Sequence, residues 1–290
     1  MLKLIFLFLL SVLSFAVNFL NSGYDFSKPV LQVILPGSLH EISGLTIVDN
    51  TTIACIQDEN GIVFFYDIEQ RKIKNQFIFG ANGDYEGITL VDKTLYILRS
   101  DGAIFEINDF QSPQPSVKTY TPQVPSENNE GLCYDPESNR LLIGAKGKIN
   151  KDPEYKDHRF IYAFNLKLKK LEPKPVFIFN VSDINITSKL NGTKMPTRTN
   201  KKGVVFETGF KLNTSEIAIH PSSKQLYVLS ASDHCLFIFN MNGKLEETKQ
   251  LDPNMFNKPE GLSFFSNADL IISNEGQTRV PTLLRFNYQR

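Results

Sequence analysis

The stretch Gly83-Asp84-Tyr85-Glu86-Gly87-Ile88-Thr89-Leu90 decides the fold, because shortened copies of it return along the chain. Two copies keep the glutamate, Asn129-Glu130-Gly131-Leu132 and Pro259-Glu260-Gly261-Leu262. Two weaker copies carry serine in its place, Ile42-Ser43-Gly44-Leu45 and Ser215-Glu216-Ile217-Ala218. The column Ser43, Glu86, Glu130, Ser215, Glu260 advances in steps of 43, 44, 85 and 45 residues. A period in the forties is typical of a β-propeller or of an array of helical pairs.

Each repeat is composed of short apolar runs. In the first repeat they cover residues 45–48, 52–56, 62–66 and 74–79, and Asp, Asn and Gly residues occur between them. These separators are residues that turns favour, so four short strands are predicted per repeat. No stretch after the first twenty residues sustains the apolar i, i+3, i+4, i+7 spacing of a helix. The sequence therefore predicts an all-β fold, a β-propeller.

The long step between Glu130 and Ser215 decides the number of blades. Apolar runs in residues 141–179 complete a single blade, and the polar segment 180–213 lacks a second set of four strands. We therefore expect five blades, with long loops at residues 148–158 and 183–202. The last repeat lacks an outer strand, and residues 30–35 are predicted to supply it and close the ring. Residues 24–290 would then form one domain.

The first twenty residues have the features of a secretory signal peptide. They combine one lysine, an apolar run and Ser14-Phe15-Ala16, a small-x-small cleavage signal. We expect cleavage near residue 20 and an extracytoplasmic protein, whether periplasmic, cell-surface or secreted. No later stretch reaches the roughly 18 apolar residues of a membrane span, so no transmembrane span is predicted in the mature chain.

Charge and cysteine content narrow the function classes. The chain has 31 basic and 31 acidic residues, so no overall field attracts nucleic acid, and no nucleic-acid partner is expected. Cys55, Cys133 and Cys235 lie far apart in apolar runs. They are interpreted as buried free thiols, with one disulfide and a spare thiol as the alternative.

The repeated column predicts a metal site. Equivalent positions of the innermost strands lie around one end of a propeller channel, so Glu86, Glu130 and Glu260 would face one small volume. Carboxylates this close repel each other unless a cation intervenes. Calcium suits such a site because it accepts six to eight oxygens in loose geometry, and Ser43 and Ser215 could complete the ring. The absence of a His or Cys cluster argues against zinc or copper.

Further charged residues are placed near the same channel end by the repeat alignment. The acids are Glu41, Asp84, Asp58, Glu59 and Glu275. They are candidates for additional ligands, and solvated turn acids are the alternative for each. Lys146 and Arg99 could replace a metal as counter-ions or bind an anionic ligand, and ordinary surface bases are the favoured alternative for both. The Glu-Gly pairs themselves could instead be turn residues whose glutamates are solvated.

The chain resembles the SdiA-regulated domain family of extracytoplasmic bacterial proteins, which is distantly similar to NHL-repeat propellers. The residues that carry the resemblance are Ile42-Ser43-Gly44-Leu45, Asp84-Tyr85-Glu86-Gly87, Asn129-Glu130-Gly131-Leu132, Ile219-His220-Pro221, Pro259-Glu260-Gly261 and Asn274-Glu275-Gly276. The resemblance spans nearly all of the mature chain. It implies a five-bladed propeller with bound calcium, and it implies no known reaction.

Three classes of function follow. The first is a calcium-binding module whose partner is an unidentified small molecule or an extracytoplasmic protein. The second is a calcium-dependent hydrolase of small esters, lactones or phosphoesters. That activity would need a base or an activated water beside the metal, and the sequence offers no acid that stands apart from the ligands. The third is a purely structural propeller without metal, so the sequence leaves enzyme activity open.

Overall fold

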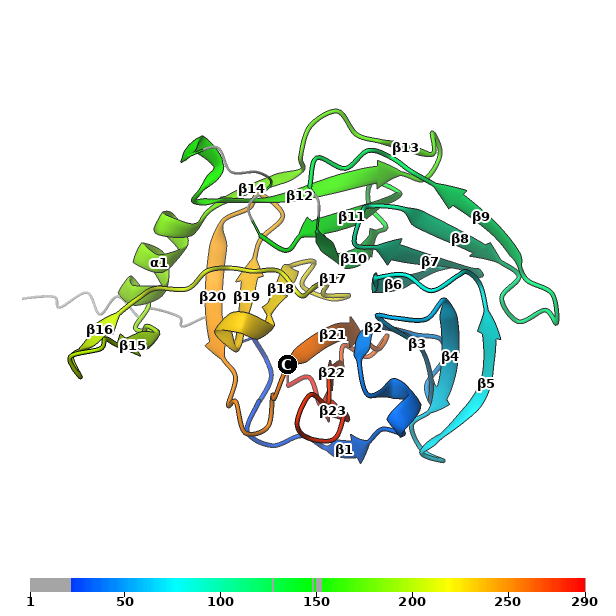
Figure 1. The fold of residues 1–290 in the computed structure, drawn as a ribbon, viewed down its shortest axis with the longest axis horizontal. Helices are drawn as coiled ribbons and strands as arrows, with labels where there is room; N and C mark the ends of the chain where they lie inside the picture. The colour runs from blue at the N-terminus through cyan, green and yellow to red at the C-terminus, as the bar shows by residue number, and fades with distance from the viewer. Residues whose placement is uncertain (1–21, 127, 148, 150–152, 290) are drawn as a thin grey trace, which may run out of the picture.

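The repeats form five antiparallel sheets arranged as blades around a central axis (Figure 1). The computed structural model describes residues 22–126, 128–147, 149 and 153–289. The predicted signal peptide at residues 1–20 lies outside them. The described part of the chain contains no helix long and apolar enough to cross a membrane. The prediction of an all-β, five-bladed propeller is confirmed.

The blades follow one another in chain order. Blade one contains β2 (Ile42–Ile47), β3 (Thr52–Gln57), β4 (Ile62–Asp67) and β5 (Lys72–Ile78). Blade two contains β6 (Tyr85–Val91), β7 (Thr94–Arg99), β8 (Ile104–Asn108) and β9 (Ser116–Tyr120). Blade three contains β10 (Asn129–Asp135), β11 (Arg140–Ala145), β12 (His158–Asn165), β13 (Lys170–Leu171) and β14 (Phe177–Asn180). Blade four contains β17 (Glu216–Ile219), β18 (Leu226–Ser230), β19 (Cys235–Phe239) and β20 (Leu245–Gln250). Blade five contains β21 (Pro259–Phe264), β22 (Leu270–Asn274), β23 (Thr282–Phe286) and β1 (Leu31–Ile34).

Blade five closes the ring, as the sequence predicts. Its outer strand β1 pairs antiparallel with β23, so that Leu31 lies opposite Arg285 and Ile34 opposite Thr282. Val33 of this strand is buried between blades five and one. The strand therefore covers a sheet edge and also contributes to the core.

The core consists of five apolar layers, one between each pair of neighbouring blades. Side chains alternate between the two faces of a strand. In β3, Ile53 and Cys55 accordingly pack toward blade five, while Ala54 and Ile56 pack toward blade two. Inner strands are buried on both faces, which explains their continuous apolar runs, whereas the outer strand β5 is mostly exposed. The three cysteines lie in these layers as free thiols, as predicted.

The segment between blades three and four differs from the prediction. Residues 183–202 were expected to form a loop, and they instead contain most of helix α1 (Val181–Leu190) and strand β15 (Thr197–Thr199), which pairs with β16 (Val205–Glu207). The Asn180 side chain caps α1 by accepting hydrogen bonds from two backbone N–H groups of its first turn. Only Val181, Ile184 and Ser188 of the helix are buried, a stripe too short to stand out in the sequence.

The other predicted loop lies partly outside the described residues. Of residues 148–158, the structure describes 149 and 153–158, and these include a 3₁₀ turn at Pro153–Tyr155. Two more 3₁₀ turns lie at Gly37–Leu39 and Ala231–Asp233.

Candidate metal centre

A β-bulge at the start of the innermost strands positions the repeated column. Strand pairing skips Ser43, Glu86, Glu130 and Glu260, one in each of four blades. Blade four has the same two-to-one pattern, since the Ser215 N–H donates to the Leu229 carbonyl at 2.8 Å and Glu216 also pairs with Leu229. A bulge redirects the side chain of its extra residue. The column is thus one structural position repeated five times, and we call these five residues the axial ring.

In four of the five blades a glycine follows the bulge, because the inner strands approach closely there. A Cβ atom on Gly87 would lie 2.6 Å from the Cβ of Leu132 and 3.0 Å from the carbonyl oxygen of Glu130. One on Gly131 would lie 3.0 Å from a side-chain carbon of Ile217. Distances this short exclude a larger residue unless the neighbouring strand moves. The close approach near the axis that the sequence predicts for these glycines is therefore present.

Glu216 occupies the glycine position in blade four. Its carboxylate accepts hydrogen bonds from the backbone N–H of Leu132 at 2.7 Å and of Ile217 at 2.9 Å, so it links blades three and four. Its other oxygen, Oε2, is buried without a hydrogen-bond partner among the described residues. Burial raises its pKa well above the usual value; the two N–H donors oppose this rise, and the charges of Glu260 and Glu86 add to it. The sequence does not single out Glu216 as a site residue. The feature that could have identified it is an acidic residue at a repeat position where the other blades have glycine.

Glu86 and Glu130 are electrostatically coupled. Burial raises the pKa of Glu86 to about 9, and the charges of Glu130, Asp84 and Glu260 add to this rise. Burial and then Glu260 raise the pKa of Glu130 to about 7, against the opposing effect of Lys146. Lys146 forms an ion pair with Oε1 of Glu130, while Oε2 is buried and lacks a hydrogen-bond partner among the described residues. The ring thus contains a buried oxygen that is free to accept a ligand.

The other side of the ring is formed by Glu260 and Ser215. Lys258 Nζ lies 3.3 Å from Oε1 of Glu260. Burial raises the pKa of Glu260, while Lys258 and the Ser215 hydroxyl lower it. Ser215 Oγ also accepts the backbone N–H of Ala231 at 3.2 Å. In blade one, the Ser43 hydroxyl donates to the Tyr85 carbonyl at 2.7 Å, so this serine links two neighbouring blades.

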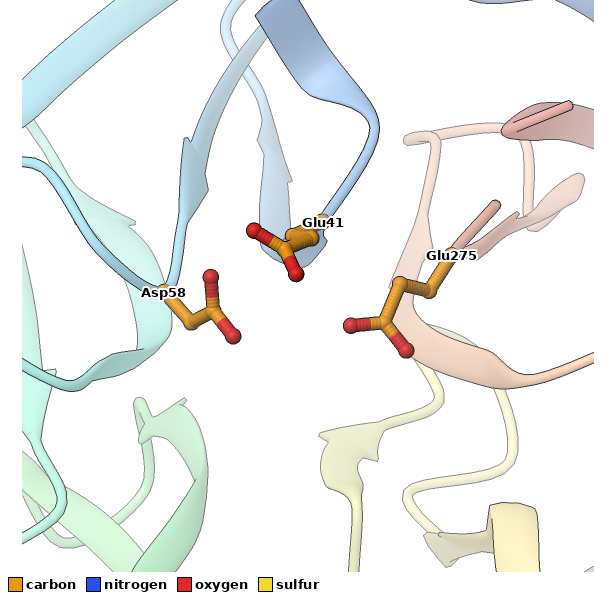
Figure 2. Close-up of side chains that lie close together, drawn as sticks. All are labelled: Glu41, Asp58 and Glu275. Atoms are coloured by element: carbon orange, nitrogen blue, oxygen red, sulfur yellow. The ribbon is translucent and has the colours of Figure 1, made fainter. Parts of the chain in front are cut away.

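A second group of acids converges more tightly than the axial ring. Figure 2 shows Glu41, Asp58 and Glu275 turned toward one another, and their closest carboxylate oxygens all lie within 4.8 Å of each other. We call these three residues the rim cluster. Among the described residues, no other group of three or more His, Cys, Asp or Glu side chains meets this spacing. Lys258 joins the rim cluster to the axial ring, because it pairs with both Glu275 and Glu260.

Asp58 is the member of the rim cluster whose charged form is disfavoured by its surroundings. Burial raises its pKa to about 6, and the charges of Glu41, Glu275 and Glu59 contribute, while Lys258 opposes them. Its Oδ1 atom is buried and has no hydrogen-bond partner among the described residues. A carboxylate in this state is stabilised either by a proton or by a cation.

The remaining predicted charged residues differ in whether they reach the axial ring. Asp84 is exposed, although its charge acts on Glu86. Arg99 pairs with Asp101 at 2.7 Å and is not brought to the ring. Lys146 does reach the ring, as the alignment predicts, and Lys258 is a second cation that the alignment missed although it stands two residues before Glu260.

A cavity of about 230 Å³, lined mostly by residues with polar side chains, opens beside the axial ring. Its lining includes Lys146, Ser215, His234, Asn257, Lys258 and Glu260. Cations, an acid, amides and a hydroxyl thus surround one small space. Lys146 and Lys258, which pair with carboxylates of the axial ring, both line it.

Comparisons with known proteins define the fold class. No family model and no curated protein matches the sequence. Among solved structures, the chain is similar to the glutaminyl cyclase of Myxococcus xanthus, with a TM-score of 0.58 at 12% identity over 90% of this chain and 95% of that one. It is also similar to a luciferin-regenerating enzyme, with a TM-score of 0.50 at 11% identity over 90% and 95% of the two chains. At such identities the similarity concerns the fold alone: this chain is a five-bladed β-propeller with an acidic channel end. Membership of the SdiA-regulated family stays a prediction.

Proposed function

We propose that the acidic channel end binds calcium, with Glu86, Glu130 and Glu260 as axial carboxylates and the rim cluster as a second group of oxygens. The observation that carries this proposal is geometric. Three rim carboxylates from separate loops have oxygens within 4.8 Å of one another, next to a ring in which Oε2 of Glu130 is buried and unpartnered. A cation at this point would offset the repulsion among the converging carboxylates.

The donor set fits calcium. Both groups offer carboxylate oxygens, and Ser43 and Ser215 add hydroxyls to the ring. Calcium prefers oxygen ligands and tolerates irregular geometry, whereas zinc and copper favour nitrogen and sulfur. When bound, calcium would supply a divalent positive charge that offsets the repulsion among these acids. Lys146 and Lys258 supply part of that charge in its absence, so we expect calcium to compete with the two ammonium groups.

We infer that the calcium-loaded channel end serves as a binding or interaction module. The cavity beside the ring offers space for a small molecule, and an extracytoplasmic protein is the alternative partner. The resemblance to the SdiA-regulated domain family supports the proposed calcium. The leader-like residues 1–20 support an extracytoplasmic location, where modules with weak calcium sites operate.

The hydrolase alternative lacks a supporting observation. A general base must stand apart from the ligands and reach the substrate. Glu216 is the one further acid of the channel described above, but it is buried and its Oε1 is occupied by two backbone N–H groups. A binding module therefore agrees better with the geometry than an enzyme does.

Calcium titration of the metal-free protein by calorimetry tests the proposal. We expect binding that is abolished by the triple change Glu86→Gln, Glu130→Gln and Glu260→Gln, and that is weakened by Asp58→Asn with Glu275→Gln. The exposed pair Asp183→Asn and Glu207→Gln is the matched control and should leave binding unchanged. Absence of binding to the wild type, or unchanged binding in the ring variant, would show that these residues are not the ligands.

A further inference from the structure

The segment between blades three and four carries a projecting two-stranded hairpin, β15 and β16 (Figure 1). Its two ends are anchored in the propeller, because Met195 and Phe210 are buried in the core layer between blades three and four. Asn185 of α1 adds two hydrogen bonds to the backbone of Phe210, at 2.6 and 3.1 Å. Between these anchors, every residue from 197 to 208 is exposed. The hairpin is thus held in place at its base and displayed to its surroundings.

The exposed hairpin carries apolar side chains at positions that are usually polar in a hairpin surrounded by water. Val204, Val205 and Phe206 are consecutive, and they are 57%, 63% and 45% exposed. On the adjoining helix, Ile186 and Leu190 are 59% and 81% exposed and lie four residues apart, on one face of α1. A separate two-stranded ribbon is marginally stable in water. Single exposed apolar residues are normal, but a run of exposed apolar residues marks a contact surface.

The same segment is strongly basic in a chain whose total charge is zero. Residues 189–211 contain six Lys or Arg residues and a single acid, Glu207. Lys189 pairs with Glu207, and no other ion pair involves these six basic residues among the described residues. The unpaired ones are Lys194, Arg198, Lys201, Lys202 and Lys211. Because all five are exposed, the segment presents a local positive field.

We propose that this segment, residues 186–211, docks the propeller onto a negatively charged lipid surface. Neighbouring residues of a strand point to opposite faces, so Val205 and Phe206 lie on the two sides of the ribbon. A protein groove would cover one face and leave the other apolar side chain in water. The interfacial region of a bilayer surrounds a ribbon and can bury both, while Lys201 and Lys202 extend their ammonium groups to lipid phosphates. The combination of apolar side chains with unpaired basic residues is the one that anionic membranes bind.

Flotation with lipid vesicles in the presence of EDTA tests this proposal without any contribution from calcium bridges. Wild-type protein should float with vesicles of phosphatidylcholine and about one third phosphatidylglycerol, and should stay behind with phosphatidylcholine alone. High salt should reduce binding to the anionic vesicles, because it screens the lysines. Failure of the wild type to float with the anionic vesicles would overturn the proposal.

Two variants separate the charge from the apolar contribution. Lys201→Glu with Lys202→Glu should lower the partition coefficient at least tenfold, since each basic residue near an anionic surface is worth about fivefold in binding. Val205→Ser with Phe206→Ser should lower it about tenfold at constant charge. Two control variants change exposed residues on the outer strands of blades one and two. Ile78→Ser is the control for the apolar change, and Lys72→Glu with Lys118→Glu is the control for the charge change. Both should bind like the wild type. Equal flotation of hairpin and control variants would place the lipid contact elsewhere and refute the proposal.

Discussion

Removing Lys258 is the most direct test of the charge balance at the channel end. This lysine lies 3.3 Å from Oε1 of Glu260 and also pairs with Glu275, and it is the contact that joins the axial ring to the rim cluster. Its side chain is 33% exposed, whereas the two carboxylate side chains are 11% and 9% exposed. Lys258→Met keeps most of the aliphatic stem and removes the charge. Two nearly buried carboxylates then lose their common cation.

The expected cost lies between two limits. An exposed ion pair contributes about 0 to 1 kcal/mol, and breaking a fully buried one costs about 3 to 5 kcal/mol. Because Lys258 is one-third exposed and its partners are buried, we expect a loss of about 2 kcal/mol in the free energy of unfolding. For a chain of this size that corresponds to a decrease in Tm of about 4 °C.

The assay is thermal unfolding in EDTA, compared with Lys189→Met as the control. Lys189 pairs with Glu207, and the two side chains are 62% and 55% exposed, so its removal should change Tm by about 1 °C or less. Added calcium should restore the Tm of the Lys258→Met variant. Calcium should also bind this variant more tightly than the wild type, because the competing ammonium group is gone. Equal effects of the two lysine changes would refute the view that Lys258 neutralises a buried acidic group.

Three further outcomes are expected. The raised pKa of Glu86, about 9, means that the folded state keeps a proton which the unfolded state releases near pH 4.5, so the stability of the metal-free protein should fall as pH rises between these values. Glu86→Gln should flatten this dependence in a denaturant titration repeated at several pH values, and an unchanged slope would assign it to other groups. Val33→Asp should prevent stable folding, because it places a charge in the layer between blades five and one. Ile34→Asp, on the exposed face of the same strand, should be tolerated. Circular dichroism of both variants checks this difference. The three buried thiols should be inert to a thiol reagent in the native protein and should all react in guanidinium, and rapid native labelling would contradict their burial.

Most of the fold was predictable because one motif recurs. The Glu-Gly or Ser-Gly step marks the start of four inner strands, and its spacing near 44 residues identifies blades without any knowledge of contacts. Even the blade-four register follows from the sequence, since Ser215 takes the bulge position and Glu216 the glycine position. Closure by residues 30–35 was predictable because the last repeat lacks a strand.

The site was predictable in its residue types and less so in its spacing. Repeat alignment places Glu86, Glu130 and Glu260 around one axis and Lys146 near the same channel end, but it does not locate Lys258, which belongs to the loop before β21. Glu41 and Asp58 flank strands of blade one and Glu275 follows a strand of blade five, so their distances depend on how the loops fold back. Helix α1 escaped detection for a similar reason, because its burial depends on contacts such as the one between Ser188 and Thr248 at 2.8 Å.

The pairing of Leu31 with Arg285 sets the order in which the chain can fold. These two residues are among the earliest and the latest of the described chain to be synthesised, so the contact has nearly the greatest sequence separation that this chain allows. Blades one to four each contain consecutive strands and can form as the chain emerges, whereas the fifth must wait for β23. We therefore expect the slow step of folding to be the meeting of the two ends, with the early segment held unpaired until the last strands are made.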